Sequence, residues 1–398
     1  MPETRRSVLQ STALGASGLV AFSSVAEAAD KYLAAMGDGG FGREVSRLPQ
    51  GDAVAVHDPK DVAEFPEFRF ALDEETPRVA SGGWVKEGWA RRFPIAKGIA
   101  GVHVLLNPGG SRELHWHATA AEWAIVLDGR CQTVVIDPSG ASEINNFERG
   151  DLWYFAKGHG HSIQTIGEKP CNIFLAFDDG GFSPDHAAFS ITDWINLTPR
   201  DILAQQFALP REAFEAFPKG ETFIQAGPIV KPEDALEAPW PKESTHKFRL
   251  LRDAKAEREF DGGSFRIATS AEFPASKTMS GGVLTIRAGA ERKLHWHPNA
   301  SEWMYFLRGR GQVTLFGSGG RGKTREFSPG DVAYAPIGFG HAIKNIGAED
   351  LEIVQVWDNG VFEEIELEAW VRSSPPYLLA NNFAGVPEAT LATIRAGR

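Results

Sequence analysis

The chain contains one sequence unit twice, and this duplication limits its fold more than any other feature. Residues 114–117 read Leu-His-Trp-His, and the same four residues return at 294–297, 180 positions later. Residues 150–154 return with the same offset at 330–334, where Gly-Asp-Leu-Trp-Tyr has become Gly-Asp-Val-Ala-Tyr. Self-similarity of this length predicts two copies of one domain.

Each copy is rich in short runs of β-branched and aromatic residues, and glycine, proline and aspartate separate these runs. The pattern predicts an all-β chain in which each copy forms a sandwich or closed barrel. Short helices are expected after each barrel, at residues 199–217 and 377–392. The expected segments are a signal peptide at 1–28, an N-terminal arm at 29–67, domain 1 at 68–218, a linker at 219–247 and domain 2 at 248–398.

The first 28 residues have the organisation of an export signal. Two arginines at positions 5 and 6 precede a weakly apolar stretch at 11–22, and Ala-Glu-Ala follows at 26–28. This order is typical of a signal peptide, and the arginine pair resembles a twin-arginine signal. The apolar stretch is shorter than the ~20 residues of a membrane span. We therefore expect a bacterial periplasmic or secreted protein that folds before export and has no membrane partner.

Charge and cysteine content exclude two further classes. Lysine and arginine number 41 against 52 aspartates and glutamates, a formal net charge of -11, so a nucleic-acid partner is not expected. Cys131 and Cys171 are the two cysteines. They are too few for a disulfide framework or a four-thiolate zinc site, although one bridge between them is possible in an oxidising compartment.

Histidines and a glutamate recur at matched positions in both copies. His115 and His117 lie two residues apart, so both imidazoles point to one face of a strand. Glu122 begins the next apolar run, and His161 comes from a later strand. The duplication repeats all four. The predicted metal ligands are His115, His117, Glu122 and His161 in the first copy, and His295, His297, Glu302 and His341 in the second.

Three neutral nitrogens and one carboxylate suit a divalent ion that keeps open positions, such as Mn, Fe, Co or Ni. Structural zinc sites normally use thiolates and close at four ligands. The matched spacing separates these ligands from the other histidines. Ordinary core or surface roles are expected for His57, His103, His159 and His246.

These motifs resemble the cupin superfamily, whose fold is a double-stranded β-helix or jelly-roll barrel. Its first motif matches Gly-x4-His-x-His-x4-Glu-x6-Gly at residues 110–129. Its second matches Gly-x5-Pro-x-Gly-x2-His-x3-Asn at residues 330–345. In the first copy Ala156 and Thr165 replace the proline and asparagine of the second motif. Those positions belong to turns and packing, and the ligands are intact.

The resemblance is closest to the bicupin oxalate decarboxylases and covers roughly residues 68 to 398. It rests on Arg-Glu-Leu-His-Trp-His at 112–117, Phe-Asp-Asp-Gly at 177–180 and Thr-Asp-Trp at 192–194. The resemblance implies an oligomeric lyase with one manganese ion per barrel. It also implies conversion of oxalate to formate and carbon dioxide, with dioxygen as a required participant.

Arginines precede the first histidine of each copy by three residues, at Arg112 and Arg292. The resemblance places them over a bound carboxylate, which suits the planar donor fork of arginine. Strict strand alternation would turn them away from the histidines, so a solvated surface role stays open.

Four extra residues lie in the first copy between Phe182 and Trp194, where the family has a mobile lid with a glutamate as proton donor. Residues 182–189 here contain no glutamate. Asp185 is the nearest carboxylic acid and His186 the next candidate. Gln355 stands where the family often has a glutamate in the second barrel, so we predict catalysis mainly at the first site.

Two alternatives follow from the altered lid. Without a good proton donor, the same chemistry could yield two carbon dioxides and hydrogen peroxide, as in an oxalate oxidase. The chain could also be a metal-binding bicupin without oxalate activity that binds another small dicarboxylate, because one fold hosts many functions.

Overall fold

The structure is a computed structural model that describes residues 65–238, 245–253 and 257–396. The signal peptide predicted at 1–28, His57 and nearly all of the arm predicted at 29–67 lie outside the described residues. Glu64–Arg398 form one compact unit. Strands dominate this unit, which confirms the all-β prediction. Among its described helices, none is both long and apolar enough to span a membrane.

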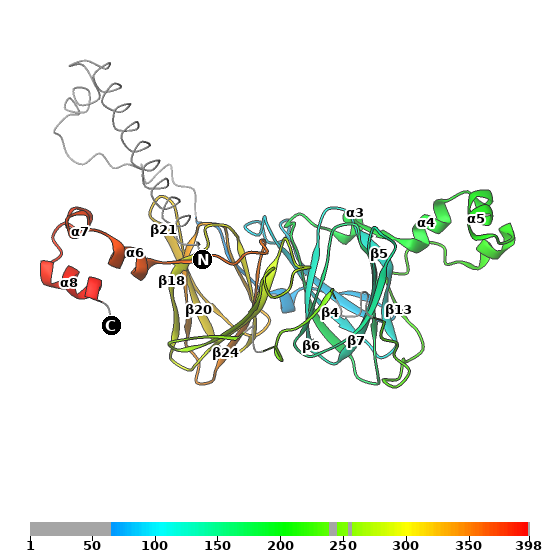
Figure 1. Cartoon of the computed structure of the whole chain (residues 1–398), viewed down its shortest axis with the longest axis horizontal. Helices are drawn as coiled ribbons and strands as arrows, with labels where there is room; N and C mark the ends of the chain where they lie inside the picture. The colour runs from blue at the N-terminus through cyan, green and yellow to red at the C-terminus, as the bar shows by residue number, and fades with distance from the viewer. Residues whose placement is uncertain (1–64, 239–244, 254–256, 397–398) are drawn as a thin grey trace, which may run out of the picture. The chain divides into compact units, whose positions relative to one another are not determined.

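The first barrel is built from two antiparallel sheets (Figure 1). Its strands are β2 (Arg78–Ala80), β3 (Gly83–Gly88), β4 (Ala100–Leu106), β5 (Gly110–His117), β6 (Glu122–Asp128), β7 (Arg130–Ile136), β8 (Ser142–Glu148), β9 (Asp151–Phe155), β10 (Gly160–Thr165), β11 (Cys171–Phe177), β12 (Ala188–Ser190), β13 (Ile224–Ala226) and β14 (Lys247–Arg249). One sheet has the order β14-β9-β6-β11-β4-β3-β2. The other has the order β12-β5-β10-β7-β8, and β13 also pairs with β5.

The second barrel repeats this plan. Its strands are β1 (Arg69–Phe70), β15 (Glu257–Phe260), β16 (Gly263–Ala268), β17 (Ser280–Ile286), β18 (Glu291–Trp296), β19 (Glu302–Arg308), β20 (Gly311–Gly317), β21 (Arg321–Phe327), β22 (Val332–Ala335), β23 (Gly340–Asn345), β24 (Leu351–Trp357) and β25 (Ile365–Glu366). The two sheets have the orders β1-β22-β19-β24-β17-β16-β15 and β21-β20-β23-β18-β25.

Short helices follow each barrel, as predicted. Two others, η2 (Leu72–Glu74) and α3 (Pro184–Ala187), lie between β1 and β2 and between β11 and β12. The helices that follow the barrels are α4 (Ile191–Leu197), α5 (Arg200–Phe207), η3 (Arg211–Ala216), α6 (Leu367–Ser373), α7 (Pro376–Asn382) and α8 (Glu388–Ala396). Large apolar side chains on them face solvent: Trp194 is 63% exposed and Trp370 is 60% exposed. These two tryptophans occupy matching positions in the two copies, and both lie on helices outside the sheets.

The two barrels exchange their first strands. β1 precedes the first barrel but pairs with β22 of the second, where Arg69 lies opposite Ala333. β14 precedes the second barrel but pairs with β9 of the first, where Arg249 lies opposite Asp151. Strand β13, within the segment 219–247 predicted as a linker, also belongs to a sheet of the first barrel. The exchange ties both barrels into one unit.

Cys131 and Cys171 are fully buried free thiols in the core of the first barrel. Burial raises the pKa of the Cys131 thiol, and contact with Cys171 raises it further. In the structure the pair contributes to apolar packing.

Candidate metal centres

The first centre lies between the two sheets of the first barrel. His115 and His117 come from β5, and His161 on β10 lies directly opposite His115 in the antiparallel register. Glu122 is the first residue of β6 in the other sheet. Its Oε2 atom is 3.4 Å from His161 Nε2 and 3.6 Å from His117 Nδ1. All four side chains are buried, and their ligand atoms lie within 4.8 Å of one another.

Hydrogen bonds to the ligand side chains fix the orientation of their imidazole and carboxylate groups. His115 Nδ1 donates to the Glu113 carbonyl at 2.7 Å, and His161 Nδ1 donates to the His159 carbonyl at 2.9 Å, so each Nε2 atom is free to bind an ion. Trp153 Nε1 donates to Glu122 Oε1 at 2.7 Å, which leaves Oε2 facing the histidines. Burial lowers the pKa of His117 to about 3, helped by the nearby His161, so this imidazole stays neutral.

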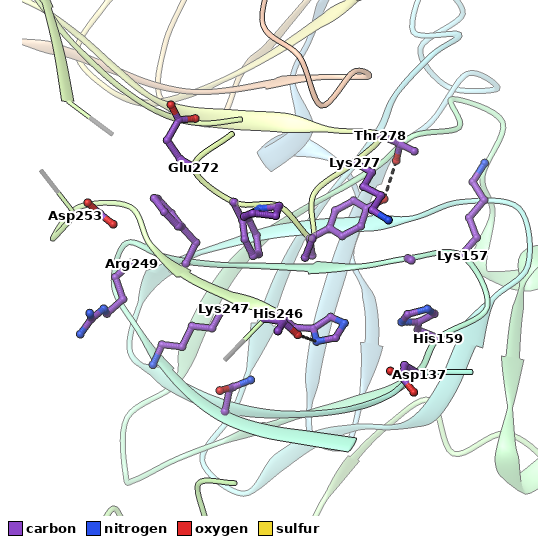
Figure 2. Close-up of a pocket in the computed structure, with 18 of the residues that line it drawn as sticks. Asp137, Lys157, His159, His246, Lys247, Arg249, Asp253, Glu272, Lys277 and Thr278 are labelled. Carbon is purple, nitrogen blue, oxygen red and sulfur yellow. Dashed lines mark hydrogen bonds between the residues drawn. The ribbon is translucent and has the colours of Figure 1, made fainter. Parts of the chain in front are cut away.

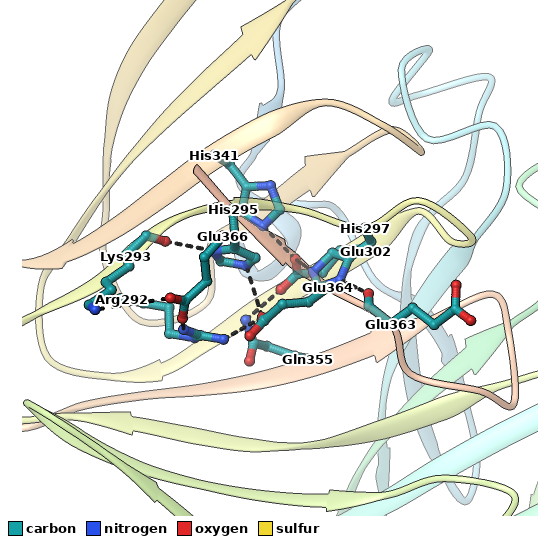
Figure 3. Close-up of polar contacts among 10 residues, drawn as sticks. All are labelled: Arg292, Lys293, His295, His297, Glu302, His341, Gln355, Glu363, Glu364 and Glu366. Carbon is teal, nitrogen blue, oxygen red and sulfur yellow. Dashed lines mark hydrogen bonds and ion pairs between the residues drawn. The ribbon is translucent and has the colours of Figure 1, made fainter. Parts of the chain in front are cut away.

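The second centre gathers the same four residue types (Figure 3), but His297 turns Nε2 toward its glutamate, whereas His117 turns Nδ1. His295 on β18 lies opposite His341 on β23, and Glu302 begins β19. Glu302 Oε2 is 2.8 Å from His341 Nε2 and 3.0 Å from His297 Nε2. Gln355 Nε2 donates to Glu302 Oε1, so Gln355 orients a ligand, the part that Trp153 plays in the first centre. Its four ligand atoms also lie within 4.8 Å of one another.

A divalent ion fits both groups. In His161 and His341 the Nδ1 atom donates to a carbonyl, so each Nε2 turns a lone pair toward a carboxylate oxygen and makes no hydrogen bond among the described residues. A buried polar atom without a partner costs free energy, and an ion at the centre of each group would remove that cost. Burial would raise the pKa of Glu302, but its histidine neighbours lower it, so the ligand carboxylate is ionised and ready to bind a cation.

A β-bulge turns Arg112 into the metal cavity. The register pairs Arg112 with Ile163 and His115 with His161, so two residues of β5 face one residue of β10. A bulge of this kind reverses alternation, and Arg112 therefore faces the same side as His115. Ser162 Oγ donates to the Arg112 carbonyl at 2.7 Å and holds the bulge. The surface role left open for Arg112 is thus wrong, because its side chain is buried.

A cavity of about 60 Å³ opens over the first centre. Arg112, His115, His117 and Glu122 line it, with apolar walls that include Phe177 and Phe182. Roughly 10–15 Å³ of such space holds one water molecule, so a small anion has room. Arg112 Nη1 donates to the Phe223 carbonyl at 3.1 Å, and Nη2 lies 3.1 Å from Glu221, which is not among the lining residues.

The second barrel has the same bulge. Arg292 pairs with Ile343 and His295 pairs with His341, and the register shifts between these two pairs. The carboxylate partners of Arg292 differ from those of Arg112. Glu364 accepts from Nη2, and Glu366 Oε1 lies 3.4 Å from Nη1.

The predicted lid, residues 182–189, contains helix α3 and the start of strand β12. Asp185 pairs with Arg78 at 3.0 Å and is 62% exposed, and His186 is also exposed. In this conformation neither residue lines the metal cavity.

Glu87 on β3 does line the cavity, and sequence reasoning missed it. Burial raises the pKa of this carboxyl group, and Arg78 and Asp185 also act on it. The repeat carried a signal: the position 180 residues later holds Ile267, a core residue with no exposed area. A carboxyl group at Glu87, where the second copy has the apolar Ile267, indicates a functional role rather than core packing.

Other histidines have local partners. His103 is buried, with Nδ1 2.6 Å from Asp73 and Nε2 2.5 Å from Asn172. His159 and His246 lie at a larger cavity of about 1380 Å³ (Figure 2), with their ring centres 6.0 Å apart. Among the described residues that line this cavity, none is one of the eight candidate ligands.

Comparison with known proteins places this fold and these two centres among the cupins. The family model described as "Cupin" matches residues 70–213 and 250–389, one match for each barrel. The class is therefore a two-barrel cupin with a four-ligand centre in each barrel.

Characterised relatives narrow this class. Oxalate decarboxylase OxdC of Bacillus subtilis (strain 168) is 35% identical over 337 residues, which cover 84% of this chain and 86% of that protein. The crystal structure of Lactobacillus farciminis oxalate decarboxylase in complex with formate has a TM-score of 0.76 and 33% identity, covering 84% of this chain and 98% of that one. A B. subtilis oxalate decarboxylase structure, from work on its Mn(II) centres, also has a TM-score of 0.76, with 32% identity and 86% and 90% coverage. The chain belongs to the bicupin oxalate decarboxylase family.

Proposed function

We propose that this protein is a manganese-dependent oxalate decarboxylase, a carboxy-lyase, and that its first centre carries the reaction. The observation that supports this most is the single cavity that Arg112 shares with the first group of ligands. A guanidinium and a divalent ion facing one small space suit a compact dianion. The characterised relatives act on oxalate, and one of the solved structures has Mn(II) centres.

Binding is assigned to Arg112 and the metal side of the cavity. Arg112 binds one carboxylate of oxalate with its donor fork, while the ligand group holds the ion that the other end of the diacid approaches. A bound manganese ion supplies Lewis acidity and redox capacity for the cleavage. Phe177 and Phe182, stacked with ring centres 4.1 Å apart, shield the reacting carbons from water.

The net reaction consumes one proton. The carbon–carbon bond of oxalate breaks, one half leaves as carbon dioxide, and the other carbon gains a C–H bond as formate. Dioxygen is proposed as a required participant that the net reaction does not consume.

Proton delivery is proposed for the rim of the cavity. In this proposal Glu87 holds the proton inside, and Asp185 on the lid replenishes it from solvent. Arg78 pairs with Asp185 and also acts electrostatically on Glu87. His186 is the further candidate on the lid. Burial raises the pKa of Glu87, which favours the protonated form that can act as an acid.

Assembly and export complete the proposal. The exposed Trp194 and Trp370 on matched helices support a homo-oligomer, because large apolar side chains in such patches mark interaction sites. Analytical ultracentrifugation tests it, and a monomer at micromolar concentration would contradict it.

A twin-arginine signal at 1–28 and a periplasmic or secreted location are tested by sequencing the mature N-terminus, which we expect to begin at residue 29.

The decisive assay compares two products. Manganese-loaded protein receives oxalate in air at mildly acidic pH, and formate and hydrogen peroxide are measured together. Formate in excess of peroxide supports the decarboxylase. Peroxide as the main product would indicate the oxidase, and no oxalate consumption would indicate a bicupin for another dicarboxylate.

A further inference from the structure

Glu364 reaches into the second metal centre. Its Oε2 atom is 3.8 Å from His295 Nε2, the nitrogen that faces the ion position, because His295 Nδ1 donates to the Lys293 carbonyl at 2.6 Å. The same Oε2 atom accepts a hydrogen bond from Arg292 Nη2 (Figure 3). One carboxylate therefore contacts both the arginine and a ligand of the second centre.

The first barrel has alanine at the equivalent place. On β12, Ser190 lies opposite His115 and Phe189 opposite Trp116, while on β25, Glu366 lies opposite His295. Ser190 and Glu366 are therefore equivalent positions. Two residues before them, Ala188 is equivalent to Glu364. Ala188 lines the 60 Å³ cavity, so the space over the first centre is open where the second barrel carries a carboxylate.

We propose that Glu364 closes the second centre by occupying the place that a substrate carboxylate takes in the first. This inference rests on the proposed function, because it uses Arg112 as the substrate-binding arginine. Arg292 corresponds to Arg112, and each Nη2 has a carboxylate partner. The partner of Arg112, Glu221, does not line the first cavity, whereas Glu364 also approaches the ligand His295. An incoming oxalate would have to displace the Glu364 carboxylate, which already pairs with Arg292 and lies beside His295.

Two other roles for Glu364 fit the geometry less well. It does not belong to the group of ligand atoms that all lie within 4.8 Å of one another, so it is not a fifth ligand of equal standing. A purely structural ion pair needs only Arg292, and Glu366 already lies 3.4 Å from that guanidinium. The approach to His295 Nε2 is the feature that neither role requires.

The test compares three manganese-loaded variants with the unaltered protein. Glu364→Ala gives the second barrel the alanine of the first. Glu366→Ser is the matched control: it gives strand β25 the serine of β12 and removes a carboxylate that pairs with Arg292 and Lys293. Glu364→Gln keeps the shape without the charge and serves if the alanine variant does not fold. Bound [¹⁴C]oxalate and manganese per chain are measured by equilibrium dialysis without dioxygen, and crystals with oxalate locate the anion.

We expect one oxalate per chain, at the first centre, in the unaltered protein and in Glu366→Ser. We expect two per chain in Glu364→Ala and at least about tenfold tighter second-site binding in Glu364→Gln, with two manganese ions retained. Oxalate at the second centre of the unaltered protein would overturn the proposal. So would a second centre that stays without anion, or loses its manganese, in Glu364→Ala. Absence of oxalate at the first centre would instead count against the proposed function, while a gain confined to the second centre of Glu364→Ala would still support the role of Glu364.

Discussion

Trp123 of the first barrel lies directly against Gly281 of the second, so closely that a Cβ atom on this glycine would be 2.5 Å from the indole Cζ2 atom. The duplicated pair repeats the contact in the opposite direction, because a Cβ on Gly101 would be 2.4 Å from Cζ2 of Trp303. Both indoles have no exposed area. The interface between the barrels therefore contains two copies of one tryptophan-on-glycine contact, in addition to the exchanged strands.

Gly281→Ala tests this contact. The added methyl group overpacks a rigid aromatic side chain, so we expect a loss of about 1–3 kcal/mol in the free energy of unfolding. Chemical denaturation measures it. Gly227→Ala is the control, because the atom nearest to its added Cβ, the Gly109 carbonyl oxygen, would be 3.6 Å away, an ordinary contact. Equal stability of the two variants would contradict the packing described here.

His115→Ala and His295→Ala separate the two centres. Each variant loses one of four ligands, so we expect manganese to fall from two ions to one per chain in both, measured by elemental analysis. Formate production should be abolished in His115→Ala and retained within several-fold in His295→Ala, because Arg112 and the ligands of the first centre share a cavity, whereas Glu364 lies between Arg292 and His295 at the second. Abolished activity in His295→Ala alone would reverse the assignment.

Three variants at the cavity rim identify the proton donor. Glu87→Gln should reduce formate release by about 10²-fold, the typical contribution of a general acid, and shift the products toward peroxide. Asp185→Ala should cost about tenfold, because another solvent path can replenish the proton, and His186→Ala less. The formate-to-peroxide ratio is the readout that a merely structural defect would leave unchanged. A larger loss in Asp185→Ala than in Glu87→Gln would make the lid the direct donor.

Glu143 on β8 predicts a pH-dependent part of stability. Burial opposes ionisation of Glu143, but contacts with His246 and Thr245 outweigh it and lower its pKa from 4.5 to about 2. The carboxylate accepts hydrogen bonds from the backbone N–H groups of Thr245 and His246, at 2.9 and 3.1 Å. A folded-state pKa below the unfolded value stabilises the protein above pH 4.5, and that contribution is lost as pH falls toward 2.

Glu143→Gln should therefore destabilise the neutral protein by about 2 kcal/mol, as expected for hydrogen bonds to a charged group. The difference from the unaltered protein should shrink as pH falls from 4.5 to 2. Denaturation with urea at a series of pH values, on metal-free samples of both proteins, measures it. A difference that does not change with pH would rule out the carboxylate as its source.

The eight ligand positions were predictable because two elementary regularities met in the sequence. Strand alternation places His115 and His117 on one face, and the duplication gives an independent second occurrence at His295 and His297. Barrel architecture followed from the same duplication. These regularities are local or periodic, and residue spacing records both.

Other features depend on irregularities that spacing does not record. The inward direction of Arg112 comes from a bulge, which breaks the alternation used to judge it. Glu364 has no acidic counterpart in the first copy, and the four-residue shift after Phe182 hides its match with Ala188. The strand exchange escaped prediction because a repeat gives the period but not the barrel with which a leading strand pairs.

The fate of the two oxalate carbons tests the central claim most directly. Manganese-loaded protein is given [¹³C₂]oxalate in air, and ¹³C NMR measures formate and total carbon dioxide per oxalate consumed. The account predicts one formate and one carbon dioxide for each oxalate, with the formate signal lost in His115→Ala. Two labelled carbon dioxides per oxalate with stoichiometric peroxide, or unchanged formate production in His115→Ala, would contradict it.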